Sequence, residues 1–158
     1  MKKRGWKAYL IFIFLAEAVG LLSGLITADA TSVYAETVAK PPLSPPAIVF
    51  PIVWTVLYAL MGIGAARVWN SPETADKKQS VNLFVAQLTV NFFWSLIFFN
   101  AQAFGFALIW IVLLWVLVLL MILSFRKVDR IAALLQIPYF LWVTFAAYLN
   151  YGVWLLNG

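Results

Sequence analysis

Aromatic side chains at helical spacing are the strongest candidates for chemistry in this sequence. Within the stretch 40–62, one set recurs at intervals of three and four residues, which places its members on one face of a helix. The set consists of Pro51, Trp54, Tyr58 and Gly62. Five prolines stand within 40–51, the last of them Pro51. Because proline fixes φ and lacks a donor, we expect an ordered, non-helical segment over 40–46, with Pro51 in the first helical turn. An aromatic, small-residue face beneath a rigid lid predicts a pocket.

Amides and rings share a second helical face. Its members follow the spacing i, i+4, i+7 and i+11, and they are Gln87, Asn91, Trp94 and Phe98. An amide that faces lipid leaves its polar atoms unsatisfied at a cost of several kcal/mol, so we expect this face to turn inward. Interhelical hydrogen bonding and the lining of a ligand site are both open as its role.

A third face lies near the end of the chain. Its members fall at i, i+4, i+7 and i+8, and they are Trp142, Ala146, Leu149 and Asn150. Pro138 precedes them, and a proline inside a helix frees a carbonyl and can kink the helix, which opens room for a ligand.

The composition excludes several kinds of site. The chain contains no cysteine and no histidine, so we expect no disulfide, no thiolate chemistry and no metal site. Its net charge of +5 does not indicate nucleic-acid binding, because the basic residues form short clusters at the ends of apolar segments. Function must rest on aromatic rings, amides, hydroxyls and a few charges.

The elements that carry these faces are predicted to be transmembrane helices. The chain is 65% hydrophobic and 11% charged, against roughly 25% charged residues in an ordinary soluble domain. We expect one all-α membrane domain over 1–158, a five-helix bundle in which 27–46 forms a lid loop and 70–80 a solvated turn. The expected spans are 9–26, 47–69, 81–99, 106–125 and 131–156. The first could instead be a signal peptide, but its apolar run is long for one.

The basic residues predict the orientation. Ten of the eleven Lys and Arg residues fall on one side of such a bundle, and Lys40 is alone on the other. The positive-inside rule then places the N-terminus in the cytoplasm, and the C-terminus and the lid outside.

The first span holds two features of open meaning. Ala16, Gly20 and Gly24 form a small-residue ladder that allows close helix packing, either within the bundle or between two protomers. Glu17 is a carboxylate deep in the span, and either a functional role or a protonated or snorkelling side chain is compatible with that position.

Most of the chain resembles the tryptophan-rich sensory protein family, also called the translocator protein or peripheral benzodiazepine receptor family. The resemblance is carried by 40–62, by QLTVNFFWSLIFF from Gln87 to Phe99 and by IPYFLWVTFAAYLN from Ile137 to Asn150. It implies a bacterial multi-pass membrane protein, commonly a homodimer. Such proteins bind porphyrins and hydrophobic drug-like molecules under the first loop, as a receptor or carrier. For some bacterial members light-dependent breakdown of protoporphyrin has been proposed, so that Trp54 and Trp142 would be the candidate catalytic residues here.

Spacing, side-chain chemistry and the resemblance together predict a set of ligand-binding residues, of which the resemblance itself implies Trp54, Trp94, Trp142, Ala146, Gln87 and Asn91. The whole set comprises Tyr34, Lys40, Pro45, Phe50, Trp54, Tyr58, Gln87, Asn91, Trp94, Phe98, Phe106, Trp142, Phe145, Ala146 and Leu149. The family's Trp-Tyr pair is Val33-Tyr34 here, so one aromatic contact of the roof is missing, and Phe106 stands where animal members have tryptophan. The cholesterol motif of animal members is incomplete, because no basic residue follows Tyr151.

The chemistry of the residues narrows the expected ligand. Trp and Tyr faces stack on flat apolar macrocycles, and without His or Cys the usual axial ligands of haem iron are missing. We therefore expect a metal-free porphyrin, as ligand and not as cofactor, with Lys40 available to a propionate. A light-dependent enzyme and a small-molecule transporter are the alternatives, and the aromatic faces could also serve only to pack the bundle.

Overall fold

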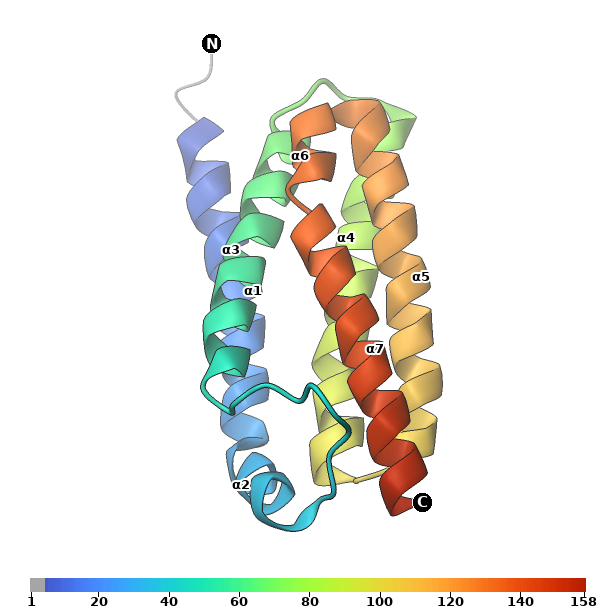
Figure 1. Ribbon diagram of the computed structural model, residues 1–158. Helices are drawn as coiled ribbons and strands as arrows, with labels where there is room; N and C mark the ends of the chain where they lie inside the picture. Colours follow the sequence, from blue (N-terminus) through green and yellow to red (C-terminus); the bar gives the residue numbers. More distant parts are fainter. Residues whose placement is uncertain (1–4) are drawn as a thin grey trace.

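The computed structural model describes residues 5–158, which form helices and connecting segments without a strand (Figure 1). The elements are α1 (Gly5–Ile26), α2 (Ala28–Thr37), α3 (Val49–Trp69), α4 (Ala75–Ser95), the π-helical turn η1 (Leu96–Asn100), α5 (Phe104–Val128), α6 (Arg130–Leu134) and α7 (Ile137–Asn157). Within this part of the chain, five helical segments are long and apolar enough to cross a membrane: α1, α3, α4 with η1, α5, and α6 with α7. The predicted all-α, five-span architecture is confirmed.

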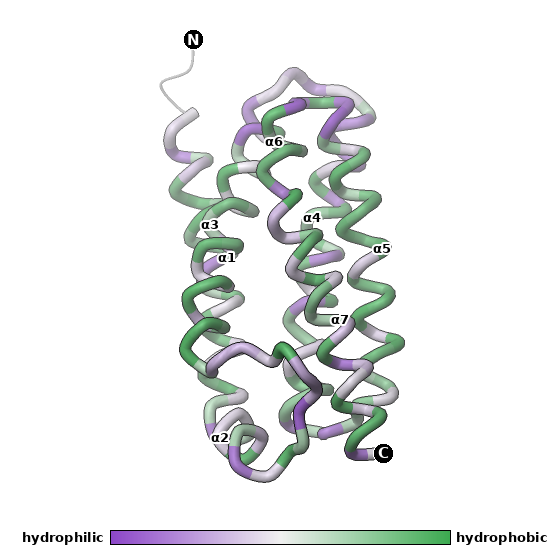
Figure 2. The backbone as a smooth tube through the Cα atoms, viewed as in Figure 1, coloured by the Kyte–Doolittle hydropathy of each residue, from purple (hydrophilic) through white to green (hydrophobic). Residues whose placement is uncertain are grey.

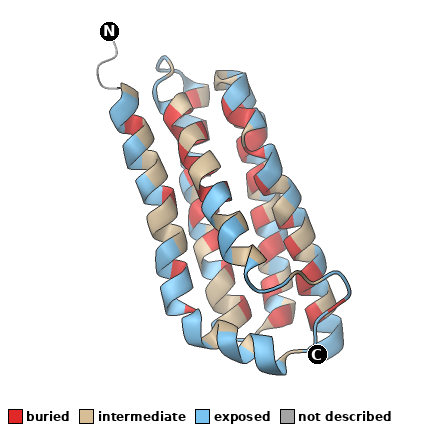
Figure 3. Ribbon diagram, turned by 60° about the vertical axis from the view of Figure 1, so that its left-hand side comes forward, coloured by how far each residue is buried: buried red, intermediate tan, exposed pale blue. Residues whose placement is uncertain are grey.

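The helices pack as a bundle whose polar residues gather at its ends (Figure 2). α1 packs on α3, α4 on α5, and α5 on α7, while α4 also meets α1 and α3. Buried residues face the interior of the bundle, and α1 is the least covered of the long helices (Figure 3). α3 meets α6 closely but does not pack closely along α7. α3 therefore packs on the last span in two ways. The backbones approach closely at α6, whereas side chains alone bridge α3 and α7.

An ion pair holds the α6 end together. Asp129 accepts hydrogen bonds from the backbone of Ile131 and Ala132 and so caps α6. The same carboxylate pairs with Arg67 at 3.1 Å, which ties the last turn of α3 to the start of α6. The helix then breaks at Leu135 and Gln136, just before Pro138. The last span is thus interrupted next to Pro138, as predicted, and Pro138 lies in the first turn of α7.

Small residues bring α1 against α3. A Cβ at Gly62 would lie 2.5 Å from the Cα of Ile13, and a Cβ at Gly20 would overlap the ring of Tyr58. Ala16 is fully buried, whereas Gly24 has open space around it. Of the alternatives for the small-residue ladder, packing within the bundle holds for Ala16 and Gly20.

Two local predictions are wrong. The lid is not a loop throughout, because its first half is the helix α2, although 40–46 is non-helical as expected. The segment 70–80 is not a solvated turn, because α4 begins at Ala75, where Thr74 caps the helix by accepting from the backbone of Lys77. Lys77 is buried, and its ammonium donates to the carbonyl of Ser71 and to Glu73. This shielding lets a charged residue lie inside the first turn of the helix.

Candidate functional site

Aromatic rings bridge the space between α3 and α7 beneath the lid. Trp54 stacks on Tyr58 with ring centroids 5.5 Å apart, and it meets Trp142 edge-on at 6.4 Å. Tyr139 meets Trp54 at 6.2 Å, and Phe50 meets Trp142 at 5.9 Å. Because the helices themselves are not closely packed here, these rings form the wall between them.

Trp142 carries an unsatisfied polar atom within this wall. Its indole Nε1 is shielded from solvent and has no hydrogen-bond partner among residues 5–158. Its ring also packs against Phe145 at 5.6 Å. Buried indole N–H groups usually find an acceptor, so this donor is available to one on a bound molecule.

A chain of buried hydrogen bonds lies directly behind the rings. The Tyr58 hydroxyl donates to Asn91 Oδ1 at 2.9 Å, and Asn91 Nδ2 donates to the Tyr139 hydroxyl at 2.7 Å. Tyr139 in turn donates to Gln87 Oε1 at 2.7 Å, and Gln87 Nε2 points to the sulfur of Met61 at 3.8 Å. The face of Gln87 and Asn91 turns inward as predicted. Here the two amides make interhelical hydrogen bonds, which hold in place the residues behind the aromatic wall.

A second aromatic group lies under α2. Trp94 stacks on Phe98 at 5.0 Å, and its Nε1 donates to Asn150 Oδ1 at 3.0 Å. Tyr34 meets Phe98 at 5.4 Å and Phe99 at 5.2 Å. Burial raises the pKa of the Tyr34 hydroxyl above its ordinary value. α2 is thus held on η1 by rings, and Trp94 is already committed to Asn150.

Lys40 closes the C-terminal end of α2. Its ammonium donates to the carbonyls of Tyr34, Ala35 and Val38 at 3.0 to 3.2 Å, and it lies 4.9 Å from the centre of the Tyr34 ring. A cation is favourable there because the last carbonyls of a helix lack partners and carry the negative end of its dipole. To meet a carboxylate on a ligand, Lys40 would have to leave these carbonyls.

The lid is fastened to the end of α7. Asn157 makes two hydrogen bonds with the backbone of Ala39, at 3.1 and 2.8 Å. The Tyr148 hydroxyl donates to the carbonyl of Pro42 at 2.9 Å, and a Cβ at Gly152 would lie 2.5 Å from the Cβ of Pro41. In Figure 1 the segment that follows α2 crosses the α7 side of the bundle before it reaches α3. These fastening residues on α7 were absent from the expected site, because nothing in their spacing marks contact with a loop about a hundred residues away.

The structure brings most of the expected residues together, in two groups. Phe50, Trp54, Tyr58, Trp142 and Phe145 line the α3–α7 wall, while Tyr34, Trp94 and Phe98 lie under α2. Ala146 and Leu149 are buried on α7, and Pro45 is half-buried in the lid.

Two positions differ from the expected set. Phe106 does not join either aromatic group, because its side chain is 54% exposed and, among residues 5–158, its ring pairs only with Trp110 on its own helix. Tyr139 belongs to the wall although the expected set omits it. Its spacing of three residues from Trp142 would have found it.

Comparison with known proteins identifies the family. A sequence model described as the TspO/MBR family matches residues 12–155. The chain belongs to the TspO/MBR family. It is 42% identical to the tryptophan-rich protein TspO of Chlorobaculum tepidum over 92% of each chain. It is 31% identical to the tryptophan-rich sensory protein of Cereibacter sphaeroides, over 96% of this chain and 92% of that one. It is 36% identical to the human translocator protein, over 73% of this chain and 69% of the human one.

The family assignment covers every part of the site. The match extends from α1 almost to the end of α7, so both aromatic groups and the lid lie within it. The resemblance inferred from the sequence is therefore confirmed, as is the assignment to a multi-pass membrane protein. Asn157 lies just beyond the matched residues.

Proposed function

We propose that this TspO/MBR member is a membrane receptor or carrier that binds a planar hydrophobic molecule, such as a porphyrin, between α3 and α7 beneath the lid. The observation that carries the proposal is the unpartnered indole donor of Trp142 within a wall of aromatic rings. A porphyrin offers a flat apolar surface for stacking, together with carboxylates that accept hydrogen bonds. Each aromatic pair contributes about 0.5–1.5 kcal/mol beyond the burial of area.

Binding requires the wall to rearrange. Trp54 and Trp142 are in mutual contact, so a macrocycle must separate their rings. Rotation of these side chains makes room, because the backbones of α3 and α7 are not closely packed here. The residues behind the wall are held by hydrogen bonds, so they keep their arrangement when the rings move.

The residues present favour a metal-free ring. The chain has no histidine or cysteine, the usual strong side-chain ligands of haem iron. Lys40 is the cation within the lid, and a propionate would replace the carbonyls that Lys40 now contacts. In this proposal Lys40 exchanges one set of acceptors for another when the ligand binds.

The test is a titration of the purified protein with protoporphyrin, followed by the shift in the porphyrin's own absorption. The double variant Trp54→Leu with Trp142→Leu should raise the Kd about tenfold or more, because at least two ring contacts are lost. The matched control is Trp6→Leu with Trp154→Leu, which removes two outward-facing indoles. Equal affinity in the wall variant and the native protein would reject this site.

The same preparation separates the alternatives. A light-dependent enzyme requires loss of porphyrin in illuminated samples that contain protein, compared with dark samples and with the wall variant. The observation that favours this second function is the edge contact of Trp54 with Trp142, which would place two oxidisable indoles beside the ligand. A transporter requires flux of a labelled porphyrin into proteoliposomes. Binding without either result leaves a receptor.

A further inference from the structure

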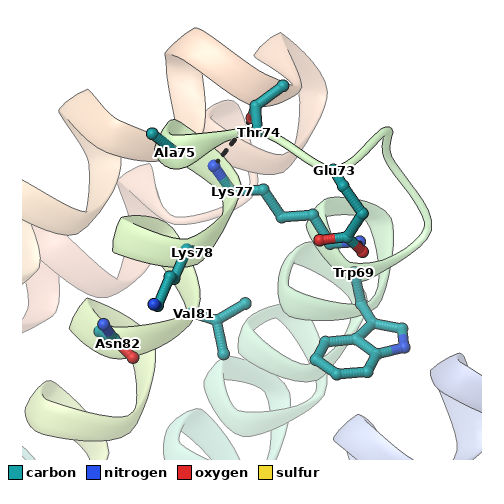
Figure 4. Close-up of a pocket in the computed structure, with 8 residues that line it drawn as sticks. All are labelled: Trp69, Glu73, Thr74, Ala75, Lys77, Lys78, Val81 and Asn82. Carbon is teal, nitrogen blue, oxygen red and sulfur yellow. Dashed lines mark hydrogen bonds and ion pairs between the residues drawn. The ribbon is translucent and has the colours of Figure 1, made fainter.

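A cavity of about 470 Å³ lies at the end of the bundle opposite the lid, between the α3–α4 connection and the first turns of α4. Its walls include Trp69, Glu73, Lys77, Lys78, Val81 and Asn82 (Figure 4). None of these residues belongs to either aromatic group of the candidate site. The cavity is therefore a separate feature of the fold.

The polar wall of the cavity has two lysines. Within the described residues, the ammonium of one is hydrogen-bonded and that of the other is not. Lys77 is bound by Glu73 and by the carbonyl of Ser71, and its ammonium lies 5.4 Å from the centre of the Trp69 ring. Lys78 is exposed, and neither its ammonium nor the amide of Asn82 has a hydrogen-bond partner within residues 5–158. In Figure 4 the side chains of Lys78 and Asn82 lie next to each other at one side of the cavity. Together they offer a positive charge and amide donors to an anion.

The opposite wall is apolar. Trp69 ends α3 and is half-exposed, and its ring packs against Phe12 of α1 at 5.7 Å. Val81 lies at the foot of the cavity, and Val85, one turn further along α4, is 53% exposed. Tryptophan at the end of a membrane span is typical of the level of the lipid headgroups. A molecule in this cavity therefore contacts polar side chains on one wall and an apolar surface on the opposite wall.

The surrounding charge favours an anion. The N-terminal end of α1, both ends of the α3–α4 connection and the α5–α6 connection gather at this end of the bundle (Figure 1). Seven cations of the described chain belong to these segments: Lys7, Arg67, Lys77, Lys78, Arg126, Lys127 and Arg130. They face three acids, Glu73, Asp76 and Asp129. The excess of positive charge attracts an anionic headgroup and disfavours a neutral one.

We propose that this cavity binds the headgroup of an anionic phospholipid such as phosphatidylglycerol. Lys78 and Asn82 contact the phosphodiester, Lys77 holds Glu73 away from it, and the acyl chains lie along Val81, Val85 and the ring of Trp69. The apolar wall is the reason for choosing a lipid over a free phosphate, because a soluble anion would leave that wall in water. Zwitterionic lipids carry no net charge to match the site.

The first experiment is native mass spectrometry of the full chain in detergent, titrated with phosphatidylglycerol or phosphatidylcholine. The native protein should retain the anionic lipid more tightly. Lys78→Gln should weaken that binding about fivefold, because one basic side chain near a lipid surface contributes about 1 kcal/mol. The control is Lys127→Gln, which removes a charge from the same end without touching the cavity. Equal losses in both variants would overturn the site, because they would show only a general attraction.

The second experiment locates the lipid directly and does not depend on the first variant. Since the chain has no cysteine, Asn82→Cys introduces a single thiol at the cavity, and Gln79→Cys introduces one on the exposed surface of the same helix. Phosphatidylglycerol should slow maleimide labelling of Asn82→Cys and leave Gln79→Cys unchanged, whereas phosphatidylcholine should slow neither. Glycerol phosphate at the same concentration should have no effect. Protection by glycerol phosphate, or equal protection of both thiols, would reject a lipid site in this cavity.

Discussion

The amide of Asn91 connects residues that the candidate site requires from three helices. It accepts from Tyr58 of α3 and donates to Tyr139 of α7, and both tyrosine rings contact Trp54. Each of these groups is buried, so every polar atom that lost its partner would remain without one. The orientation of Trp54 is therefore set by hydrogen bonds that it does not itself make.

Removal of one hydroxyl tests this dependence. Tyr139→Phe leaves Asn91 Nδ2 and Gln87 Oε1 without their partner, and we expect a loss of about 1 kcal/mol in the free energy of unfolding. Reversible denaturation in mixed micelles measures this loss. Tyr151→Phe is the control, because Tyr151 is 48% exposed and its hydroxyl makes no hydrogen bond within residues 5–158. A loss as large in the control would mean that the hydroxyl of Tyr139 has no special role.

At the level of the elements, the five spans were predictable and the lid helix was not. Long apolar runs identify spans because every backbone polar group in lipid must be satisfied by the helix itself. α2 is short and polar, and it depends on contacts with distant residues: Tyr34 rests on Phe98 and Phe99. Local spacing cannot show such contacts. The start of α4 differs from this case, because Thr74 is a local N-cap residue that could have placed it from the sequence.

The candidate site, like the fold, was predictable from the sequence only in part. The faces of Gln87 with Asn91 and of Trp142 with Ala146 turn inward, since helical periodicity specifies which residues share a side. Periodicity does not specify which neighbour each face meets. For that reason Trp94 is found with Asn150, away from Trp54, and Phe106 is on the outer surface.

The close approach of α1 and α3 at Gly62 gives a prediction at this level. Gly62→Ala places a methyl group against the backbone of Ile13, where no side chain can move aside. We expect a loss of about 1–3 kcal/mol in the free energy of unfolding, as is typical of overpacking. Gly24→Ala is the matched control, because it adds the same group to α1 in open space and should be neutral or slightly stabilising. Thermal unfolding in detergent compares the two, and similar values would contradict the packing described for Gly62.

The hydrogen bonds that fasten the lid to α7 give a second prediction about the elements. Asn157→Leu removes both hydrogen bonds to Ala39, and we expect about thirtyfold faster hydrogen exchange of the amides in 38–46, since each bond contributes about 1 kcal/mol. Asn100→Leu serves for comparison, because Asn100 is exposed and its side chain makes no hydrogen bond in the described chain. Unchanged exchange in Asn157→Leu would show that the lid is held by other contacts.

The molecule as a whole has two unlike ends. One is closed by α6 and is rich in basic residues, and the other carries the lid and the rings. A homodimer remains a prediction, because Ala16 and Gly20 are already used within the bundle. The two ends suggest separate partners: lipid headgroups at the basic end and a planar ligand at the other.

The orientation of these ends in the membrane is testable. The charge bias predicts that the basic end faces the cytoplasm. In intact cells a membrane-impermeant maleimide should label Asn100→Cys, at the lid end, and should label Asn70→Cys only after the cells are opened. The absence of native cysteine makes the background low. The reverse pattern would place the lid in the cytoplasm.

The contact of Asn157 with the lid also bears on how the protein is handled. Asn157 is the last residue of α7, so any segment fused directly after this helix begins beside the lid. An affinity tag at that position can alter the apparent affinity for a ligand without any change in the rings. A tag placed before α1 lies at the far end of the bundle, and it leaves the α7 fastening as it is.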